Sequence, residues 1–281
     1  MSEVRLYLKE PTTVPIEAEV IRPDQFAVLS AAEIVALPVF YGNEKCALSD
    51  LFTVEGERSD QVRLAGEGTA RVKYAGQGMQ AGRLAIEGEA GMHTGAEMRG
   101  GEIVVEGNAG DWLGAEMRGG AIHVRGNAGH LVGAAYRGSR RGMNGGAIYI
   151  LGNAGQEVGA RMRRGLIVVG GNAGDFVGLD MIAGTVIVFG ALGRRPGAGM
   201  RRGTIVTMQP PDSSKGSVLL PTFRADATYR PVFLRLYLAA ARSAGFEVRP
   251  EWLAGSYRHF HGDLNSVGKG EILIYGGNGA V

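Results

Sequence analysis

The chain repeats the stretch Gly107-Asn108-Ala109-Gly110-Asp111-Trp112-Leu113-Gly114, which has the pattern Gly-x-x-Gly-x-x-x-Gly. Successive copies follow one another with a fixed period of about 19 residues, which is typical of a repeat architecture. Only the spacing between the third and the fourth copy is longer, because seven additional residues fall in the stretch 138–144. The six copies open at Gly88, Gly107, Gly126, Gly152, Gly171 and Gly190.

A short apolar run closes every repeat. Its β-branched side chains favour a strand over a helix. The outer two residues of each run are apolar or Thr while the middle one varies, which is the period of two of a strand with one buried face. A helix is disfavoured because each glycine would cost it about 1 kcal/mol. The runs are 103–105, 122–124, 148–150, 167–169, 186–188 and 205–207.

These patterns predict an all-β fold, a right-handed parallel β-helix (solenoid) with about 19 residues per coil, plus a C-terminal helix and tail. Stacked coils would together bury an apolar face that one strand cannot bury alone. The expected handedness is that of parallel crossovers, and the glycines are expected at corners. We divide the chain into a β-rich cap at residues 1–65, the β-helix at 66–208, and a linker, helix and tail at 209–281.

The two ends of the chain lack the repeat. Val4–Leu8 alternates like a strand, and Ser30 with Glu33 has the pattern of a capping box that opens a short helical turn. Near the other end, residues 231–243 predict a helix that ends before Gly245. This helix would either close the open end of the β-helix or dock a partner chain. Its predicted apolar face holds Phe233, Leu236, Tyr237 and Ala240.

Composition narrows the class of protein. Glycine makes up 47 of 281 residues, and with a fixed period this indicates repeats rather than disorder. The net charge of +2 predicts no general attraction to nucleic acid. A lone cysteine, Cys46, excludes a disulfide within the chain. The N-terminus does not resemble a signal peptide and no apolar run is long enough to span a bilayer, so we expect a soluble cytoplasmic protein without membrane contact.

Stacking would turn equivalent repeat positions into columns. The asparagines that follow the first glycine are expected to hydrogen-bond along the stack. The eleventh position is expected to fill the core with flexible apolar side chains. The asparagines are Asn108, Asn127, Asn153 and Asn172, and the eleventh position holds Met98, Met117, Tyr136, Met162, Met181 and Met200.

The twelfth position is arginine in every copy except one, which has Ile182. Like charges at this spacing repel each other. One interpretation is neutralisation by the neighbouring Glu97, Glu116 and Asp180 in surface pairs. The other is a partner-facing surface, because arginine suits an acidic protein surface or a polycarboxylate ligand. The candidate residues are Arg99, Arg118, Arg137, Arg163 and Arg201 of the column, with Arg140 and Arg141 of the insertion.

The remaining motifs indicate no reaction. His259 and His261 form an H-x-H pair, but no third ligand cluster accompanies them. Gly268-Lys269-Gly270 lacks the flanking residues of a phosphate-binding loop. We therefore predict no catalytic residue, no metal site and no cofactor bound by this chain alone.

Several stretches together resemble a known family. The glycine repeats, read with Gly262-Asp263-Leu264 and with 268–273, are similar to the C subunits of formylmethanofuran dehydrogenase and of the bacterial formyltransferase/hydrolase complex. The stretch 51–57 resembles the strand that precedes the repeats in that family. The resemblance covers nearly the whole chain. The glycine repeat alone is less specific, since the C-terminal domain of glutamate synthase has a similar one.

The resemblance implies a β-helical subunit that holds catalytic subunits together and has no catalytic motif of its own. The chemistry would belong to a metal-dependent amidohydrolase subunit and a formyltransferase subunit. Such a complex passes a one-carbon unit between formyl-tetrahydromethanopterin, a methanofuran-type carrier and formate. Carriers of this type have acidic, glutamate-rich tails, so the resemblance implies that the arginine column faces a partner subunit or such a tail.

Two related alternatives stay open. The chain could be the C subunit of an archaeal-type dehydrogenase, which adds a molybdenum or tungsten pterin subunit, or a glutamate-synthase-like β-helical spacer. A β-helical enzyme that cleaves polysaccharides is disfavoured, because it needs clustered acids. A hexapeptide-repeat acyltransferase is also disfavoured, because its coils are multiples of six residues.

Overall fold

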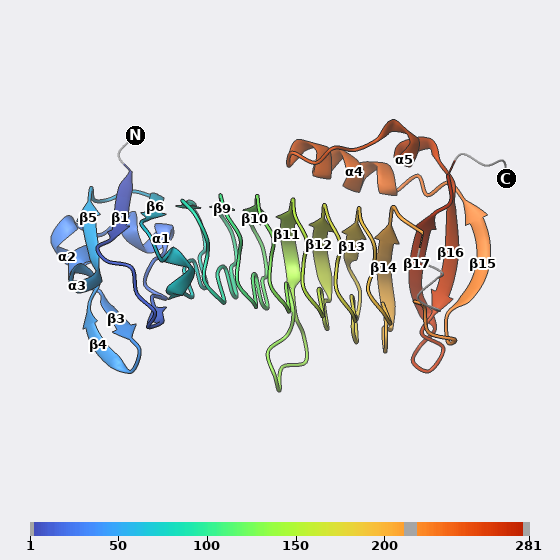
Figure 1. Ribbon diagram of the computed structural model, residues 1–281, viewed down its shortest axis with the longest axis horizontal. Helices are drawn as coiled ribbons and strands as arrows, with labels where there is room; N and C mark the ends of the chain where they lie inside the picture. The colour runs from blue at the N-terminus through green and yellow to red at the C-terminus, as the bar shows by residue number, and fades with distance from the viewer. Residues whose placement is uncertain (1–2, 211–217, 278–281) are drawn as a thin grey trace.

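The computed structural model describes residues 3–210 and 218–277 of the chain. Within these residues the strands form a 13-stranded sheet and a separate four-stranded sheet. Figure 1 shows the strands of the larger sheet side by side along the long axis of the molecule. The larger sheet has three parts, which are an N-terminal end, a central series from the glycine repeats, and a C-terminal end.

The N-terminal end of the larger sheet is built by β1 (Val4–Leu8), β5 (Phe52–Glu55) and β6 (Gln61–Ala65). Strand β1 pairs in parallel with β6 and antiparallel with β5. The predicted strand at Val4–Leu8 is therefore confirmed. The other elements here are β2 (Ile16–Glu17), α1 (Pro23–Phe26), α2 (Ala31–Val35), β3 (Pro38–Tyr41), β4 (Glu44–Ala47), α3 (Leu48–Leu51), the 3₁₀ turn Thr69–Arg71 and β7 (Val72–Lys73).

The smaller sheet has the order β4-β3-β2-β7. Helix α2 begins at the predicted capping box, where the Ser30 hydroxyl oxygen accepts from the Glu33 N–H and the Glu33 carboxylate accepts from the Ser30 N–H. Two donors of the first helical turn are thus satisfied, which stabilises a helix only five residues long.

The glycine repeats supply the central series of parallel strands. Each predicted apolar run lies in one of them, and the runs are in register, with Ile122 between Ile103 and Ile148. The strands are β8 (Arg83–Ile86), β9 (Glu102–Val105), β10 (Ala121–Val124), β11 (Asn144–Ile150), β12 (Arg164–Val169), β13 (Thr185–Val188) and β14 (Arg202–Thr207).

The C-terminal tail completes the larger sheet. Strand β17 (Lys269–Tyr275) pairs in parallel with β14. Strand β16 (Tyr257–Gly262) then pairs antiparallel with β17, and β15 (Arg224–Tyr229) pairs antiparallel with β16. The last three strands therefore occupy the end of the sheet that the predicted helix was expected to close.

The predicted fold class is wrong and is corrected by this sheet topology. The repeat pattern predicts an all-β, right-handed parallel β-helix, whereas the strands form one open, mostly parallel sheet beside a second, smaller sheet. Outside the larger sheet, successive repeats contribute isolated bridges such as Ala90 to Ala109 and Ala109 to Ala128. The reason is local, because the glycine-rich part of each repeat turns at positive φ and leaves only the β-branched run able to extend.

The inner face of the larger sheet packs on the main hydrophobic core. The column of methionines is buried there, as predicted, with Met98, Met117 and Met162 fully enclosed. The prediction was wrong for one repeat, in which Met143 and not Tyr136 occupies the buried position of the column. The asparagine ladder is confirmed, since the Asn127 backbone N–H donates to Asn108 Oδ1 at 2.8 Å and the next repeat does the same.

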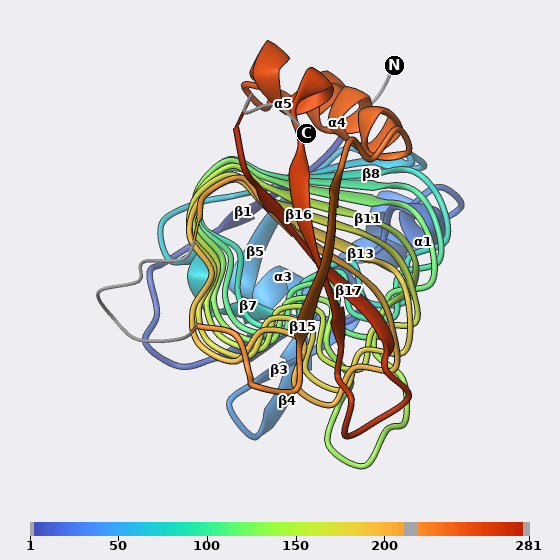
Figure 2. The ribbon, with the colours of Figure 1, turned by 90° about the vertical axis from the view of Figure 1, so that its right-hand side faces the viewer.

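Two helices cover part of the outer face of the sheet. Figures 1 and 2 show α4 (Leu234–Ser243) and α5 (Pro250–Ala254) along one side of the stack, over β11–β14. A second hydrophobic cluster joins them to the strands, with Leu234, Leu238 and Trp252 packed near Val168 and Ile187. The helix thus lies along the sheet rather than across its open end.

The predicted apolar face of α4 is wrong. The buried residues are Leu234, Leu238 and Ala241, whereas Leu236 is 76% exposed and Phe233 is 37% exposed. Both sets fit a helical period, so the period alone could not choose the face that meets the sheet.

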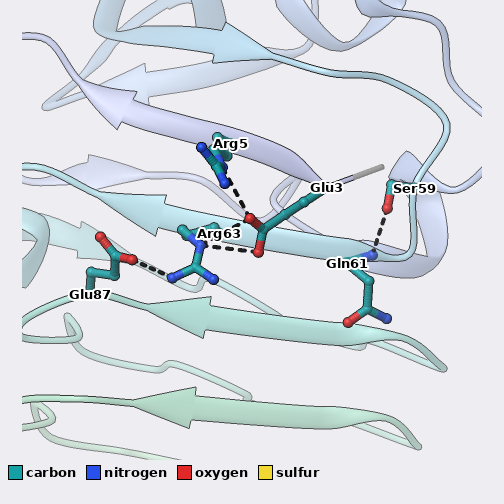
Figure 3. Close-up of polar contacts among 6 residues, drawn as sticks. All are labelled: Glu3, Arg5, Ser59, Gln61, Arg63 and Glu87. Atoms are coloured by element: carbon teal, nitrogen blue, oxygen red, sulfur yellow. Dashed lines mark hydrogen bonds and ion pairs between the residues drawn. The ribbon is translucent and has the colours of Figure 1, made fainter. Parts of the chain in front are cut away.

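Near the N-terminal end of the sheet, the outer face carries charged side chains in place of helices. Figure 3 shows Arg63 of β6 between two carboxylates, with its Nε 3.0 Å from Glu3 Oε1 and its Nη1 donating to Glu87. Arg5 Nε also donates to Glu3, at 3.0 Å. Exposed pairs of this kind keep the surface solvated and contribute little to stability individually.

Candidate functional site

The seven-residue insertion forms a loop that is fixed at both of its ends. At its start, the ring of Tyr136 stacks on Trp112 at 4.9 Å between centroids, and its hydroxyl lies 2.9 Å from His93 Nδ1. Burial raises the pKa of Tyr136 well above its usual range. At its end, the Met143 N–H donates to the Gly133 carbonyl at 2.8 Å. The loop therefore leaves the repeat and returns to it at the start of β11, where the pairing of β11 with β12 shifts register between Asn144 and Ala147.

The middle of the loop is held from the next repeat. The Arg161 guanidinium donates to the Ser139 carbonyl at 2.9 Å, and the Gly142 N–H donates to the Arg161 carbonyl at 2.9 Å. Arg140 and Arg141 lie between these contacts and are exposed. Figure 1 shows this loop beneath β11, on the opposite side of the stack from α4.

A groove of about 890 Å³ lies between the insertion loop and the β16–β17 loop. Its lining is dominated by guanidinium groups from several repeats, and the β16–β17 loop contributes an aspartate and two small polar residues. The lining residues are Arg140, Arg141, Arg161, Arg163, Asp180, Ile182, Gly199, Arg201, Asp263, Asn265 and Ser266.

The two carboxylates of this groove are already engaged. Asp180 Oδ2 lies 3.5 Å from Arg161 Nε. Asp263 is buried and accepts from the Gly199 and Asn265 backbone N–H groups, both at 3.0 Å. Burial by itself would raise the pKa of Asp263, but these hydrogen bonds to the charged form outweigh it and hold the pKa below its usual range. Neither carboxylate is left as a free base.

The arginines of the groove are less engaged than its carboxylates. Within the described ranges, no ion pair joins Arg140, Arg141, Arg163 or Arg201 to a carboxylate. Five guanidiniums face two carboxylates in the lining, so the groove carries an excess of positive charge. Such a surface attracts anions.

A second groove, of about 440 Å³, lies on the other side of the insertion loop. Arg140 and Arg141 line both grooves, so the loop is a shared wall. Glu116 Oε1 accepts from the Tyr136 backbone N–H at 3.0 Å, and the only acid that pairs with Arg118 among the described residues is Glu97, at 3.9 Å. The second groove is lined by Glu116, Arg118, Ser139, Arg140, Arg141, Gly142 and Asn144.

The structure brings five of the seven predicted arginines together. Arg118, Arg140, Arg141, Arg163 and Arg201 line one or both grooves. Arg99 and Arg137 line neither groove.

The place of Arg137 in the predicted column is corrected. The Asn144 N–H donates to the Met117 carbonyl and the Arg163 N–H donates to the Met143 carbonyl, so Asn144 holds the equivalent position. The sequence contained a signal for this, because the stretch 143–146 repeats the Met-x-Gly-Gly of 117–120. Arg161 and Asp263, which also line the larger groove, were missed because neither belongs to the predicted column.

Among the described residues, the acids that were predicted to neutralise the arginine column pair with only one of its arginines, Arg118. Glu97 pairs with Arg118 at 3.9 Å, whereas Asp180 pairs with Arg161, outside the column. Glu116 forms no ion pair in the described part of the chain. Long contacts between exposed groups are weak, so most of the positive charge remains available.

The H-x-H pair lies near two carboxylates at the C-terminal end of the sheet. His259 Nδ1 is 3.5 Å from Asp226 Oδ2, and its Nε2 is 3.4 Å from Glu271 Oε2. His261 Nδ1 is 3.9 Å from Asp226. Among residues 3–210 and 218–277, however, no group of three or more His, Cys, Asp or Glu side chains could hold a metal ion.

No helix in the described part of the chain has the length and hydropathy needed to span a bilayer.

Comparisons with known proteins give the family of this chain. The family model described as the GXGXG motif matches residues 57–218. A solved chain of the formyltransferase/hydrolase complex FhcABCD from Methylorubrum extorquens, in complex with methylofuran, is similar with a TM-score of 0.84 and 34% identity. That likeness covers 96% of this chain and 98% of the other.

Curated relatives match over shorter stretches. The C subunit of the tungsten-containing formylmethanofuran dehydrogenase 2 from Methanothermobacter marburgensis is 37% identical over 100 residues, or 34% of this chain. The C subunit of the molybdenum-containing formylmethanofuran dehydrogenase 1 from Methanosarcina barkeri is 44% identical over 97 residues. The matches span only 37% and 32% of the length of these two relatives.

The matched stretch includes the glycine repeats, while the structural likeness extends to both ends of the sheet. This chain therefore belongs to the GXGXG-motif family, together with the C subunits of formylmethanofuran dehydrogenases and a chain of the formyltransferase/hydrolase complex.

Proposed function

We propose that this chain is a non-catalytic, structural subunit of a formyltransferase/hydrolase complex in one-carbon metabolism that depends on tetrahydromethanopterin and a methanofuran-type carrier. The observation that carries the proposal is the 34% identity to a chain of such a complex over 96% of the present chain. In this role the protein assembles other subunits, and the overall reaction takes formyl-tetrahydromethanopterin to formate.

The partners belong to this proposal. They are an amidohydrolase subunit and a formyltransferase subunit of the same complex, and they hold the metal and the methanofuran-type carrier. The cytoplasmic location predicted from the sequence is part of the same proposal. The similar solved complex contains methylofuran, which supports a carrier of that class.

The geometry of the larger groove supports a role without catalysis. A general base needs a free acceptor within hydrogen-bonding reach of a substrate proton. Asp180 faces Arg161, and Asp263 accepts from two backbone N–H groups. The groove thus offers positive charge for binding and no disengaged carboxylate for proton transfer.

A second candidate is the C subunit of a molybdenum or tungsten formylmethanofuran dehydrogenase. Two observations favour it, namely the 37% and 44% identities to C subunits of such enzymes. The two candidates differ in their partners, because the dehydrogenase requires a subunit that holds a molybdenum or tungsten pterin.

Native purification of the tagged chain from its own host tests both candidates. The co-purifying proteins are identified by mass spectrometry, and formate release is measured with formyl-tetrahydromethanopterin. We expect an amidohydrolase and a formyltransferase, with activity in the complex and none in the isolated chain. A pterin-binding subunit among the partners would move the chain to the dehydrogenase. Purification of the chain without partners would refute the subunit role.

A further inference from the structure

We infer that the side of α4 that faces away from the sheet binds an amphipathic helix of a partner chain, whose apolar stripe is bordered by aspartate or glutamate. The apolar residues of this side are Val232, Phe233, Leu236 and Ala239, and together we call them the α4 outer face. The inference deepens the proposed subunit role and rests on it, because it gives the place where one partner chain attaches and the chemistry of that chain.

The α4 outer face exposes large apolar side chains that do not hold the helix on the sheet. Leu234 and Leu238, on the opposite side of α4, are buried against the strands, whereas Val232 is 69% exposed and Leu236 is 76% exposed. Figures 1 and 2 show α4 on the outside of the molecule, with no other described element above it. Exposed apolar clusters of this kind mark surfaces that bind a partner.

The spacing of the exposed residues suits a second helix. Val232, Leu236, Ala239 and Ser243 follow one another at intervals of four, three and four residues, so they form a stripe along α4. The stripe is about 16 Å long, which is three turns of a helix. Ala239 and Ser243 have short side chains, which allow a second helix to approach closely, while Leu236 provides a ridge for its groove.

A basic hollow of about 420 Å³ borders the α4 outer face on one side. Tyr237 of α4 lines this hollow, and its ring lies against Phe233 at 6.2 Å between centroids, so the hollow adjoins the apolar stripe. Three arginines also line it, and no carboxylate does; they are Arg163, Arg164 and Arg202. Within residues 3–210 and 218–277, no ion pair joins Arg164 or Arg202 to a carboxylate, so their charge is available to a partner.

The other side of the α4 outer face is basic as well. Arg235 Nε donates to the Leu253 carbonyl at 3.2 Å, and Arg242 Nη2 donates to the Val248 carbonyl at 3.3 Å. These bonds position both side chains beside α4 without neutralising them, because a carbonyl oxygen has no net charge. The apolar stripe therefore runs between two positive borders, which complement a helix with carboxylates on both sides of its own apolar stripe.

The same charges argue against a second copy of this chain as the partner. Two copies related by a twofold axis would present the same surface to each other, and the arginines of one copy would meet those of the other. Like charges that face each other across an interface oppose association. The occupant is therefore a chain of different sequence that is acidic where this surface is basic.

Photo-cross-linking in the assembled complex tests this inference. The photoreactive amino acid p-benzoylphenylalanine replaces Leu236 in the tagged full chain, which is purified from its own host with its partners and irradiated. Mass spectrometry then identifies the cross-linked peptides. We expect one partner chain to be captured through a peptide that has apolar residues at helical spacing, bordered by Asp or Glu.

Substitutions measure how much the surface contributes to assembly. We expect Leu236→Glu to lower the amount of this partner that co-purifies about tenfold, because a carboxylate would replace an apolar contact at the centre of the interface. Arg164→Gln/Arg202→Gln should lower it about threefold, and added salt should lower it in the wild type. The matched control is Val28→Glu, since Val28 is 74% exposed near the other end of the chain, and we expect less than a twofold change. Urea denaturation of each isolated chain checks that the variants fold.

Several outcomes would overturn the inference and leave the subunit role intact. They are a complex that assembles without a cross-link from position 236, a cross-link to a second copy of this chain, and a cross-link to a peptide without acidic residues. Equal losses of partner in Leu236→Glu and Val28→Glu would also overturn it, because the effect would then be one of net charge. Purification of the wild-type chain without any partner gives a different pattern, which refutes the subunit role and, with it, the partner helix.

Discussion

The two halves of the larger sheet share an inner face but differ on the outer one. One outward column runs in register through every repeat. Towards the N-terminus the column is mixed and includes the charged Arg63 and the small Ala85, whereas from β11 onwards every member is apolar or aromatic. Its members are Arg63, Ala85, Val104, His123, Tyr149, Val168, Ile187, Val206 and Leu273.

This contrast shows that the inner and outer faces of the repeat have separate constraints. The inner residues of each apolar run are buried in both halves, so the strands form in both. The middle residue of each run points outward and determines which side chains pack on the outer face of the sheet. From β11 onwards, where it is apolar or aromatic, it packs in the cluster that contains α4 and α5, whereas Arg63 is flanked by two carboxylates.

The first prediction concerns the face that the halves share and has the largest expected effect. Gly101 and Gly146 have φ of +82° and +83°, and a Cβ would lie 2.6 and 2.7 Å from the Gly82 and Gly120 carbonyl oxygens respectively. We expect Gly101→Ala and Gly146→Ala each to lower the free energy of unfolding by about 4 kcal/mol, from strain and overpacking together. Urea denaturation measures both.

A matched control for the glycine variants is Gly138→Ala. Gly138 also has positive φ, but nothing lies within 4 Å of the position that a Cβ would take, so only the backbone strain of about 1 kcal/mol remains. If the losses of unfolding free energy in Gly101→Ala and Gly146→Ala differed by more than about 2 kcal/mol, the two halves would not share the same constraint on their inner face.

The second prediction concerns the covered half. Leu238 of α4 is fully buried against the strands, whereas Leu236 is 76% exposed on the same helix. We expect Leu238→Ala to lower the free energy of unfolding by about 3 kcal/mol, and Leu236→Ala by less than about 0.5 kcal/mol. Equal costs for the two variants in urea denaturation would show that the helix does not depend on the sheet.

The third prediction concerns the boundary between the halves and has the smallest effect. His123 stacks on Tyr149 at 5.0 Å between centroids, and burial lowers its pKa, with Arg83 acting in the same direction and Glu102 opposing. The unfolded chain therefore binds a proton more readily than the folded one. Stability due to neutral His123 is complete above the unfolded pKa of about 6.5 and declines as the pH falls through it.

We accordingly expect the melting temperature to fall less between pH 7.5 and pH 5.5 in His123→Phe than in the wild type. Part of the fall should remain, because burial also lowers the pKa of His93. Calorimetry at several pH values measures the difference. Parallel curves for the two proteins would mean that the His123 ring is as well solvated as it is in the unfolded chain.

Much of the strand pattern could be predicted from the sequence. The apolar runs determine the strands because β-branched residues with a period of two have few alternatives. The overall class could not be predicted, since a glycine-rich segment indicates a turn without showing whether it ends in another strand. The buried face of α4 was predicted wrongly for a related reason. Leu236 and Leu238 are equally apolar, and only packing against the sheet distinguishes them.

The candidate site was predicted in part. Arg118, Arg163 and Arg201 follow from the period, and Arg140 and Arg141 follow from the insertion. Carrying the same period straight into the insertion placed Arg137 in the arginine column, although Asn144 occupies that position. Asp263 could not be predicted at all, because its contact with Gly199 joins segments 64 residues apart.

The reversal of strand direction at both ends of the sheet has a consequence for self-association. In the larger sheet, β1, β6, β8 to β14 and β17 run in one direction, β5 and β16 run against it, and β15 returns to the direction of the repeats. If the β15 edge of one copy met the β5 edge of another with the stacks aligned, these two strands would run antiparallel, so the second copy could not continue the parallel register of the repeats. The exposed, polar β15 also makes a poor template for apolar stacking. The stack thus has the periodicity of a fibre but ends that oppose polymerisation.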